Sequence, residues 1–225
     1  MSSDWLSRPG TDRIKRINPF AMIAKLWPKD VVYAKQREIV QSVEDDDETY
    51  VTAGNKLGKD WIAAKICVVN FLRCLKLKIR CRIVTHSVAE HHLKVLWAEI
   101  ANCIRSCSVP LLERDGGPLV INHMDVRRAD ERDAKNPDSY LVGRVSDKGE
   151  GLAGHHAEYT LFVGDESSGL EDVAYEMSQG WAHRKLLFGN PNQCTNFWRR
   201  GIKGGDVVRE YTQADVERWE RENSA

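Results

Sequence analysis

Apolar and polar positions along the chain follow two alternating patterns: short runs of strand-forming residues, and longer stretches in which apolar residues recur at helical spacing. The clearest helical stretch follows Lys59, where Ile62, Ile66, Val69 and Leu72 fall on one face. The predicted helices are Val32–Val43, Lys59–Leu75, Val88–Cys107 and Tyr175–Gly180. The predicted strands are Thr49–Thr52, Ile79–Thr85, Leu119–His123, Tyr140–Val145, Thr160–Gly164 and Lys185–Phe188.

Short apolar strands that alternate with helices are typical of an α/β domain with a mostly parallel central sheet flanked by helices. We expect this domain to span residues 31–200. Residues 1–30 are rich in Pro, Arg and Lys and predict an irregular N-terminal arm. Residues 201–225 predict a polar tail or linker helix, with Thr212–Glu222 as its helical part.

Two local features accompany these elements. Residues 125–138 are very polar and predict an exposed loop. Ser87 stands just before a predicted helix, where a hydroxyl can cap the free backbone N–H groups.

A glycine-containing loop joins the strand Thr49–Thr52 to the helix after it. Such a loop points backbone N–H groups at phosphate oxygens, and a lysine at its end reaches the terminal phosphates. Gly58 and Lys59 fill the two central positions of this pattern, so the sequence predicts a nucleotide-binding site. The loop consists of Ala53, Gly54, Asn55, Lys56, Leu57, Gly58, Lys59 and Asp60.

The loop departs from the pattern at two positions. Ala53 stands where the first glycine is expected, and Gly54 follows one residue late. Asp60 stands where a serine or threonine normally ligates Mg²⁺. A carboxylate there holds magnesium directly or through water, at a cost in affinity for a polyanion, or it only caps the helix.

The strand Thr160–Gly164 delivers two adjacent carboxylates, Asp165 and Glu166, at its C-terminal end. Ligands of open α/β sheets bind at that end of the strands. The expected division of roles has Asp165 holding Mg²⁺ and Glu166 orienting and deprotonating the attacking water. The loop and this pair together predict an ATPase that uses ATP and Mg²⁺.

Composition and charge narrow the class of protein. No apolar run approaches the roughly 18 residues of a membrane span, and the start lacks an apolar signal core, so we expect a cytoplasmic protein that does not bind membranes. The six cysteines show no Cys-x-x-Cys spacing, which favours buried reduced thiols over a zinc site. The formal net charge is zero, but Lys65–Ala89 carries six basic residues and no acidic one. This basic strip either meets nucleic-acid phosphates or is a solvated surface.

Taken in order, a glutamine, the loop, Asp165-Glu166 and Gly189-Asn190-Pro191 resemble the ATPase domain of phage large terminases, the motors that package DNA into proheads. The resemblance covers about residues 28–200 and implies a RecA-like P-loop (ASCE) NTPase fold. It is densest in Tyr140–Val145, Lys148–Gly154, Leu161–Leu170 and Lys185–Phe197.

The resemblance also implies roles and partners. Gln36 looks like the residue that reads adenine, and Asn190 belongs to a motif that senses the γ-phosphate and couples hydrolysis to DNA movement. Arg144 is the candidate for a catalytic arginine supplied by a neighbouring subunit; the alternative is an exposed arginine at a strand end. The implied partners are double-stranded DNA, the portal protein, the small terminase subunit and other copies of the chain in a ring, in the host cell cytoplasm.

Large terminases also carry a nuclease domain, and only about 25 residues follow the last motif here, so no nuclease activity is expected of this chain. It is either an ATPase domain cut from a longer protein or a natural short relative. Two other functions stay open: another RecA-like DNA-dependent ATPase, and a prophage remnant that binds nucleotide without hydrolysing it.

Overall fold

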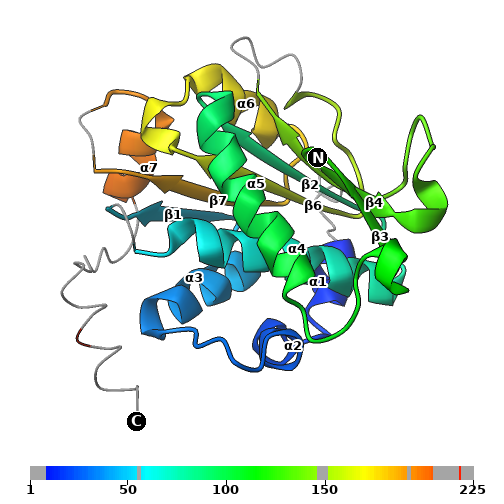
Figure 1. Ribbon diagram of the computed structural model, residues 1–225. Helices are drawn as coiled ribbons and strands as arrows, with labels where there is room; N and C mark the ends of the chain where they lie inside the picture. The colour runs from blue at the N-terminus through cyan, green and yellow to red at the C-terminus, as the bar shows by residue number, and fades with distance from the viewer. Residues whose placement is uncertain (1–8, 55–56, 146–151, 192–193, 205–217, 219–225) are drawn as a thin grey trace.

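A sheet with the strand order β1-β7-β6-β2-β5-β4-β3 forms the centre of the computed structural model (Figure 1). The model describes residues 9–54, 57–145, 152–191, 194–204 and 218. From β1 to β5 the neighbouring strands are parallel, and β4 and β3 are antiparallel, which confirms the predicted mostly parallel sheet. The strands are β1 (Glu48–Thr52), β2 (Cys81–Ser87), β3 (Leu119–Asn122), β4 (Asp125–Arg128), β5 (Tyr140–Arg144), β6 (Tyr159–Asp165) and β7 (Arg184–Gly189).

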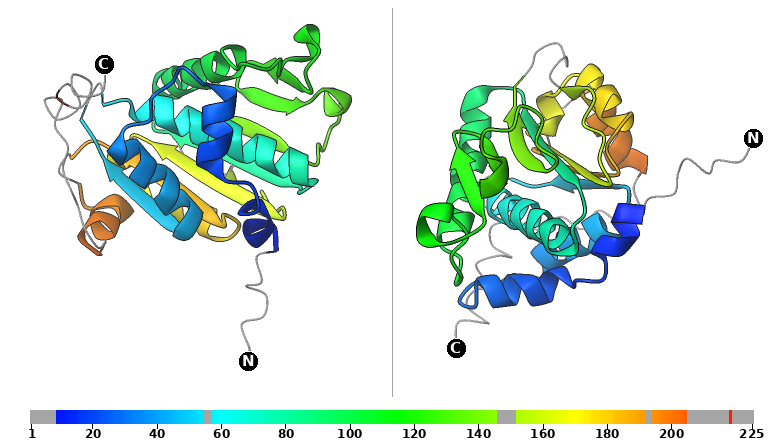
Figure 2. Two further views of the ribbon diagram at one scale, coloured as in Figure 1. Left: turned by 90° about the horizontal axis from the view of Figure 1, so that it is seen from below. Right: turned by 90° about the vertical axis from the view of Figure 1, so that its right-hand side faces the viewer.

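Helices cover both faces of the sheet (Figure 2). One face packs against the five helices from α1 to α5, with α4 running across the middle of the sheet. The other face packs against α6 and α7. The helices are α1 (Pro9–Ile14), α2 (Pro19–Leu26), α3 (Ala34–Asp45), α4 (Lys59–Leu77), α5 (Glu90–Arg105), α6 (Asp172–Gln179) and α7 (Phe197–Gly204).

Strands β6 and β7 are buried along their whole length. Their runs of aliphatic and aromatic residues fit this position, because a parallel strand covered on both faces has no solvent side. Gly164 lies just before Asp165 at the end of β6, and Gly189 ends β7 just before Asn190, so polar groups emerge together at the carboxyl edge of the sheet.

The N-terminal segment is more regular than its composition indicates. The expectation of an irregular arm over residues 1–30 is wrong for the described part, since α1 and α2 lie there and pack on α4. Asn18 caps α2 by accepting a hydrogen bond from the Ala21 N–H at 3.0 Å. Ile23 and Trp27 are buried against the core, so a few apolar residues suffice to anchor short helices.

Part of the predicted loop over residues 125–138 is also wrong, because it contains strand β4. Val126 is fully buried and pairs with Leu141 of β5. The polar neighbours satisfy one another: the Arg127 guanidinium bonds both carboxylate oxygens of Asp125 and the Ala134 carbonyl. One apolar side chain is thus enough for a strand whose other face is solvated.

Ser87 does not cap the following helix. It is the last residue of β2 and lies in register with Asp165 of β6, while Ala89 precedes α5 and gives no side-chain cap. The strand runs two residues further than predicted because β6 continues to pair with it.

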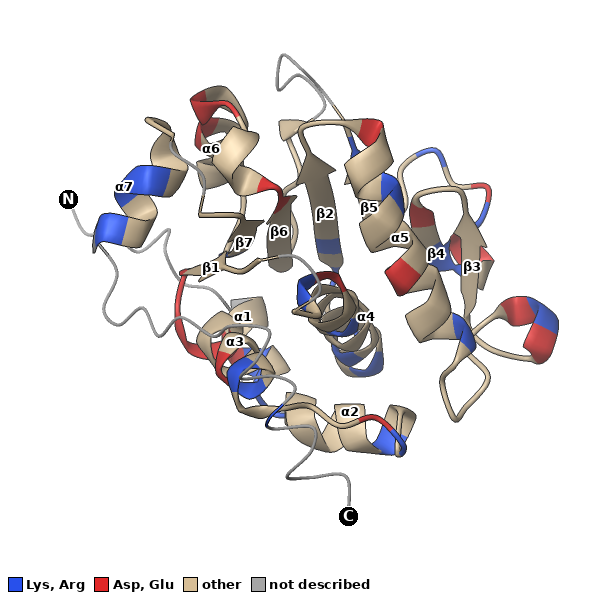
Figure 3. Cartoon of the chain, turned by 60° about the vertical axis from the view of Figure 1, so that its left-hand side comes forward, with Lys and Arg blue, Asp and Glu red and all other residues tan. Residues whose placement is uncertain are grey.

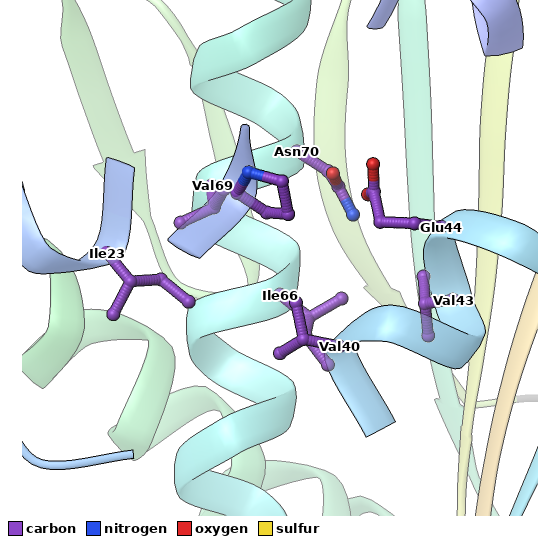
Figure 4. A pocket seen from close by; sticks show the side chains of 8 residues that line it. Ile23, Val40, Val43, Glu44, Ile66, Val69 and Asn70 are labelled. Atoms are coloured by element: carbon purple, nitrogen blue, oxygen red, sulfur yellow. The ribbon is translucent and has the colours of Figure 1, made fainter. Parts of the chain in front are cut away.

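Helix α4 buries the Arg73 guanidinium against a carboxylate of α3. Arg73 is fully buried and bonds both carboxylate oxygens of Glu44 on α3, at 2.5 and 2.7 Å. Arg73 also donates to the Asn70 side chain and to the Ile14 carbonyl, which ties α4 to α1 and α3. Glu44 and Asn70 border a cavity of only about 10 Å³ between α2, α3 and α4, too small for a ligand (Figure 4).

No helix in the described part of the chain is long and apolar enough to cross a membrane. The helix predicted at Thr212–Glu222 lies outside the described residues except for residue 218.

Candidate active site

Three predicted features meet at one edge of the sheet. They are the glycine-containing loop of residues 53–60 (the phosphate loop), the carboxylate pair Asp165-Glu166, and the Gly-Asn-Pro motif. Strand β7 lies between β1 and β6, with Thr52 paired to Gly189 and Gly164 paired to Leu187. Because the three strands are parallel, the residues that follow them leave the sheet on the same side. The Ala53 N–H also donates to the Gly189 carbonyl at 3.1 Å. Segments far apart in the sequence therefore form one site.

In the described part of the phosphate loop, the chain turns sharply at Gly58 and enters helix α4. Gly58 has a left-handed conformation, with φ of 73°, and a β-carbon there would lie 2.9 Å from the Gln36 Nε2 atom. Glycine is therefore strongly favoured at this turn. Helix α4 begins at Lys59 without a side-chain cap, so its first N–H groups remain available to an anion. Asn55 and Lys56 lie outside the described residues.

Lys59 and Asn190 converge on the Glu166 carboxylate. The Lys59 ammonium forms an ion pair with Glu166 Oε1 and lies 4.0 Å from Asp165 Oδ1. The Asn190 Nδ2 atom donates to Glu166 Oε2 at 3.2 Å. Glu166 thus has a cation on one oxygen and an amide on the other. The predicted Lys59, Asp165, Glu166 and Asn190 form one contiguous cluster.

Glu166 has an unusual backbone. Its φ is 51°, in the left-handed region that costs a non-glycine residue about 1–3 kcal/mol. Its N–H bonds the Asp165 side chain at 2.9 Å, and its carbonyl accepts from the Gly169 N–H at 2.9 Å. The chain therefore turns sharply after Asp165, and hydrogen bonds on both sides of Glu166 close this turn.

The cluster is rich in negative charge. Burial raises the pKa of Asp165 to about 7, and the nearby carboxylates of Asp60 and Glu166 add to the rise, against the effect of Lys59. The pKa of Asp60 is also raised. Burial is the main cause, the charge of Lys59 acts against it, and the charge of Glu166 adds to it. Three carboxylates therefore share one lysine, an arrangement that a divalent cation would relieve.

A cleft of about 910 Å³ opens beside the phosphate loop, between α3, β1 and α7. Gln36, Tyr33 and Lys59 line this cleft, and the Lys59 ammonium pairs with the Glu166 carboxylate. Its volume falls within the usual range of small-molecule sites, roughly 300–1,000 Å³. The base and sugar of a nucleotide would have room here, with its phosphates on the loop.

Two residues of this region had no role in the sequence analysis. The Tyr33 hydroxyl donates to the Leu57 carbonyl at 2.8 Å and so supports the loop. Tyr33 precedes α3 by one residue, and its proximity to Gln36 is the signal that could have identified it. Asn196 donates to the backbone that follows Glu166, and no sequence pattern marks it.

Arg144 is the last residue of β5 and is exposed. Its carbonyl accepts a hydrogen bond from His86 Nδ1 at 2.7 Å, and β2 separates it from β6. It therefore lies at the carboxyl edge of the sheet, on strand β5, two positions along from β6. Its exposure suits contact with another molecule, and its catalytic role remains a prediction.

The basic strip of Lys65–Ala89 is not a continuous surface. Lys65 is buried, with its ammonium 2.5 Å from Asp30 Oδ2 and over the ring of Trp27. Arg73 is buried with Glu44 as described above. The exposed basic residues of the strip, which nucleic-acid phosphates could contact, are Lys76, Lys78 and Arg80.

The residues present fit ATP and Mg²⁺. Gln36 Oε1 and Asn190 Oδ1 are buried acceptors that have no hydrogen-bond partner within the described part of the chain. No group of three or more His, Cys, Asp or Glu side chains among the described residues is arranged to hold a metal alone. Mg²⁺ in nucleotide sites needs only one or two carboxylates besides phosphates and water. The cysteines are free thiols, four of them buried.

Comparison with solved structures identifies the same fold in large terminase ATPase domains. A mutant of the Thermus phage P74-26 large terminase ATPase domain has a TM-score of 0.63 and 13% identity, over 92% of this chain and 91% of that chain. Another structure of this ATPase domain has a TM-score of 0.54 and 11% identity, over 85% and 78%. The HK97 bacteriophage large terminase has a TM-score of 0.53 and 11% identity, over 80% of this chain and 37% of that chain.

No family model matches the sequence, and no curated protein matches it. Because the structural neighbours share so few identical residues, the comparison establishes the fold alone. The chain has a RecA-like α/β fold, and the loop predicted to bind phosphate lies with Asp165 and Glu166 at the carboxyl edge of its sheet. The particular fold is that of phage large terminase ATPase domains.

Proposed function

We propose that this chain is the ATPase domain of a DNA-packaging motor of the large terminase type. The observation that carries the proposal is the convergence of Lys59 and Asn190 on Glu166, beside Asp165. A phosphate-binding lysine, a metal carboxylate, a base and a polar sensor are the groups that phosphoryl transfer to water requires.

Each residue has a distinct part. Lys59 and the N-terminus of α4 bind the β and γ phosphates, and Gln36 lies where the adenine would enter. Asp165 and Asp60 hold Mg²⁺, which would neutralise charge developing on the phosphates. Glu166 orients the attacking water and accepts its proton.

Lys59 and Glu166 restrain each other in this structure. A bound γ-phosphate would offer Lys59 a second anion and so free one oxygen of Glu166 for the water. Asn190 would keep the other oxygen in place. Arg144, on a neighbouring copy, would stabilise charge on the transferred group.

The motor function adds partners that the fold of the neighbours suggests. They are duplex DNA, the portal protein, the small terminase subunit and other copies of the chain in a ring, all in the host cytoplasm. No nuclease activity is proposed. The crowding of Asp60 against Asp165 favours a second candidate, a protein that binds nucleotide without hydrolysing it.

Phosphate release from ATP tests the proposal, measured for the wild type with and without linear duplex DNA. Lys59→Ala should abolish release, while Lys76→Ala, an exposed lysine of the same helix, should leave it unchanged. Stimulation by DNA supports the motor. ATP binding without release at any protein concentration would support the non-hydrolysing candidate instead.

A further inference from the structure

The turn after Glu166 is held by one side chain from a distant part of the sequence. Asn196 Nδ2 lies 2.6 Å from the Leu170 carbonyl oxygen, 3.2 Å from that of Ser168 and 3.4 Å from that of Ser167. The shortest of these is a well-formed hydrogen bond, and the other two carbonyls share the same donor group.

The turn itself is short and sharply bent. The Gly169 N–H donates to the Glu166 carbonyl at 2.9 Å, and the Leu170 N–H donates to the Ser167 carbonyl at 3.3 Å. The Ser167 hydroxyl donates back to the Gly164 carbonyl at 2.9 Å. These bonds hold Glu166 in its left-handed conformation, which persists only where the surroundings impose it.

The residues that follow Asn196 are bound to Asp172, the first residue of α6. The next residue, Phe197, donates its N–H to Asp172 Oδ1 at 2.5 Å, and Arg200 of α7 pairs with the same carboxylate at 3.1 Å. Figure 3 shows α7, which carries basic residues, beside α6, which carries acidic ones. The segment that begins at Asn196 is therefore tied to the start of α6.

The same segment also touches the end of β7. Trp198 is fully buried, and its ring lies 2.8 Å from where a β-carbon of Gly189 would stand. Gly189 directly precedes Asn190, whose amide bonds the Glu166 carboxylate. Two asparagines six residues apart in the sequence thus contact Glu166 and its turn: Asn190 bonds the side chain, and Asn196 bonds the backbone that follows it.

We propose that Asn196 is a positioning residue, which holds the turn of residues 167–170 and thereby fixes the direction of the Glu166 carboxylate. This inference rests on the proposed ATPase function, because positioning matters only if Glu166 acts on water. It extends that function to a residue outside the sequence motifs. A displacement of Asn196 would therefore shift the turn of residues 167–170 and with it the Glu166 carboxylate.

Asn196→Asp is the sharpest variant, since it keeps the size of the side chain and removes the donor. Hydrogen exchange of the Gly169 and Leu170 amides should accelerate about tenfold, the effect of one lost hydrogen bond. The kcat for ATP should fall about tenfold, with KM within about twofold, because ATP binding does not use this turn. Asn196→Ala should behave alike. Asn102→Asp, an exposed residue of α5, is the matched control and should change neither quantity.

Wild-type exchange and kcat in Asn196→Asp would overturn the inference, since a space-filling role survives this change. A fall in kcat without faster exchange of the two amides would overturn it as well. Failure of the proposed function is a separate result: the wild type would release no phosphate, while the exchange rates would still decide whether Asn196 holds the turn.

Discussion

The Asn190 side chain donates to Glu166 Oε2 at 3.2 Å, so the Gly-Asn-Pro motif contacts the carboxylate proposed to act as the base. The bond joins the end of β7 to the residue after β6, two neighbouring strands of the sheet. Any displacement of Asn190 would therefore act directly on the carboxylate proposed to be the base.

This contact gives the first prediction. Asn190→Ala should lower kcat for ATP about tenfold and leave the ATP dissociation constant within about threefold, because one hydrogen bond to a charged group is lost and the phosphate loop is intact. Steady-state phosphate release and equilibrium binding measure the two quantities. Asn102→Ala is the exposed control. A variant that binds ATP at least tenfold more weakly would show that Asn190 is a binding residue.

Asp60 should prove to be a metal ligand. Asp60→Ala is expected to raise the Mg²⁺ concentration for half-maximal ATPase activity about tenfold, since one oxygen near the ion is lost. Asp60→Thr should return the Mg²⁺ concentration for half-maximal activity to the wild-type value, because a hydroxyl then occupies the position of the carboxylate. Asp133→Ala removes an exposed carboxylate and is the control. A lower Mg²⁺ requirement in Asp60→Ala would show that this carboxylate only hinders binding.

Asp165 should make the metal-free protein less stable as pH rises. Its pKa is raised from 3.8 to about 7 in the folded state, so the unfolded chain loses this proton first. The stabilisation from the retained proton is complete below about pH 4 and is lost as pH rises to about 7, a change of roughly 4 kcal/mol.

Asp165→Asn removes this dependence. Thermal unfolding without Mg²⁺ should show the variant to be more stable than the wild type at pH 8, and the advantage should shrink toward pH 4. An equal difference at both pH values would contradict the raised pKa.

The buried pair of Arg73 and Glu44 should matter for stability and not for binding. Glu44→Gln leaves the Arg73 charge buried and uncompensated, which should cost about 3 kcal/mol in the free energy of unfolding. Glu38→Gln on the same helix breaks only a solvated pair with Lys35 and should cost less than about 1 kcal/mol. Urea unfolding measures both. Equal costs would mean that burial of the pair has no consequence.

Much of the fold could be predicted because its most deeply buried strands contain continuous apolar runs. Leu161–Gly164 of β6 and Leu186–Gly189 of β7 have no polar residue, so the positions of both strands and of the carboxylates Asp165 and Glu166 could be predicted from the pattern alone. Lys59 was found for the same reason, since a strand, a glycine turn and a helix follow one another directly.

The missed features depend on contacts between distant residues. Nothing local distinguishes Lys65 and Arg73 from surface cations, because their partners Asp30 and Glu44 are brought close only by helix packing. Asn196 bonds backbone carbonyls more than twenty residues earlier in the sequence, which requires α7 to fold back over β7. The helices α1 and α2 were not predicted, because the Pro, Arg and Lys content of residues 1–30 indicated an irregular arm and the capping residue Asn18 was not considered.

The most direct test compares phosphate release by Glu166→Gln and Glu171→Gln. Both changes remove one carboxylate, but Glu171 is exposed at the start of α6 and Glu166 lies between Lys59 and Asn190. The account predicts that Glu166→Gln lowers kcat at least about hundredfold while ATP still binds, and that Glu171→Gln keeps the wild-type rate. Wild-type turnover in Glu166→Gln would contradict the assignment of this site.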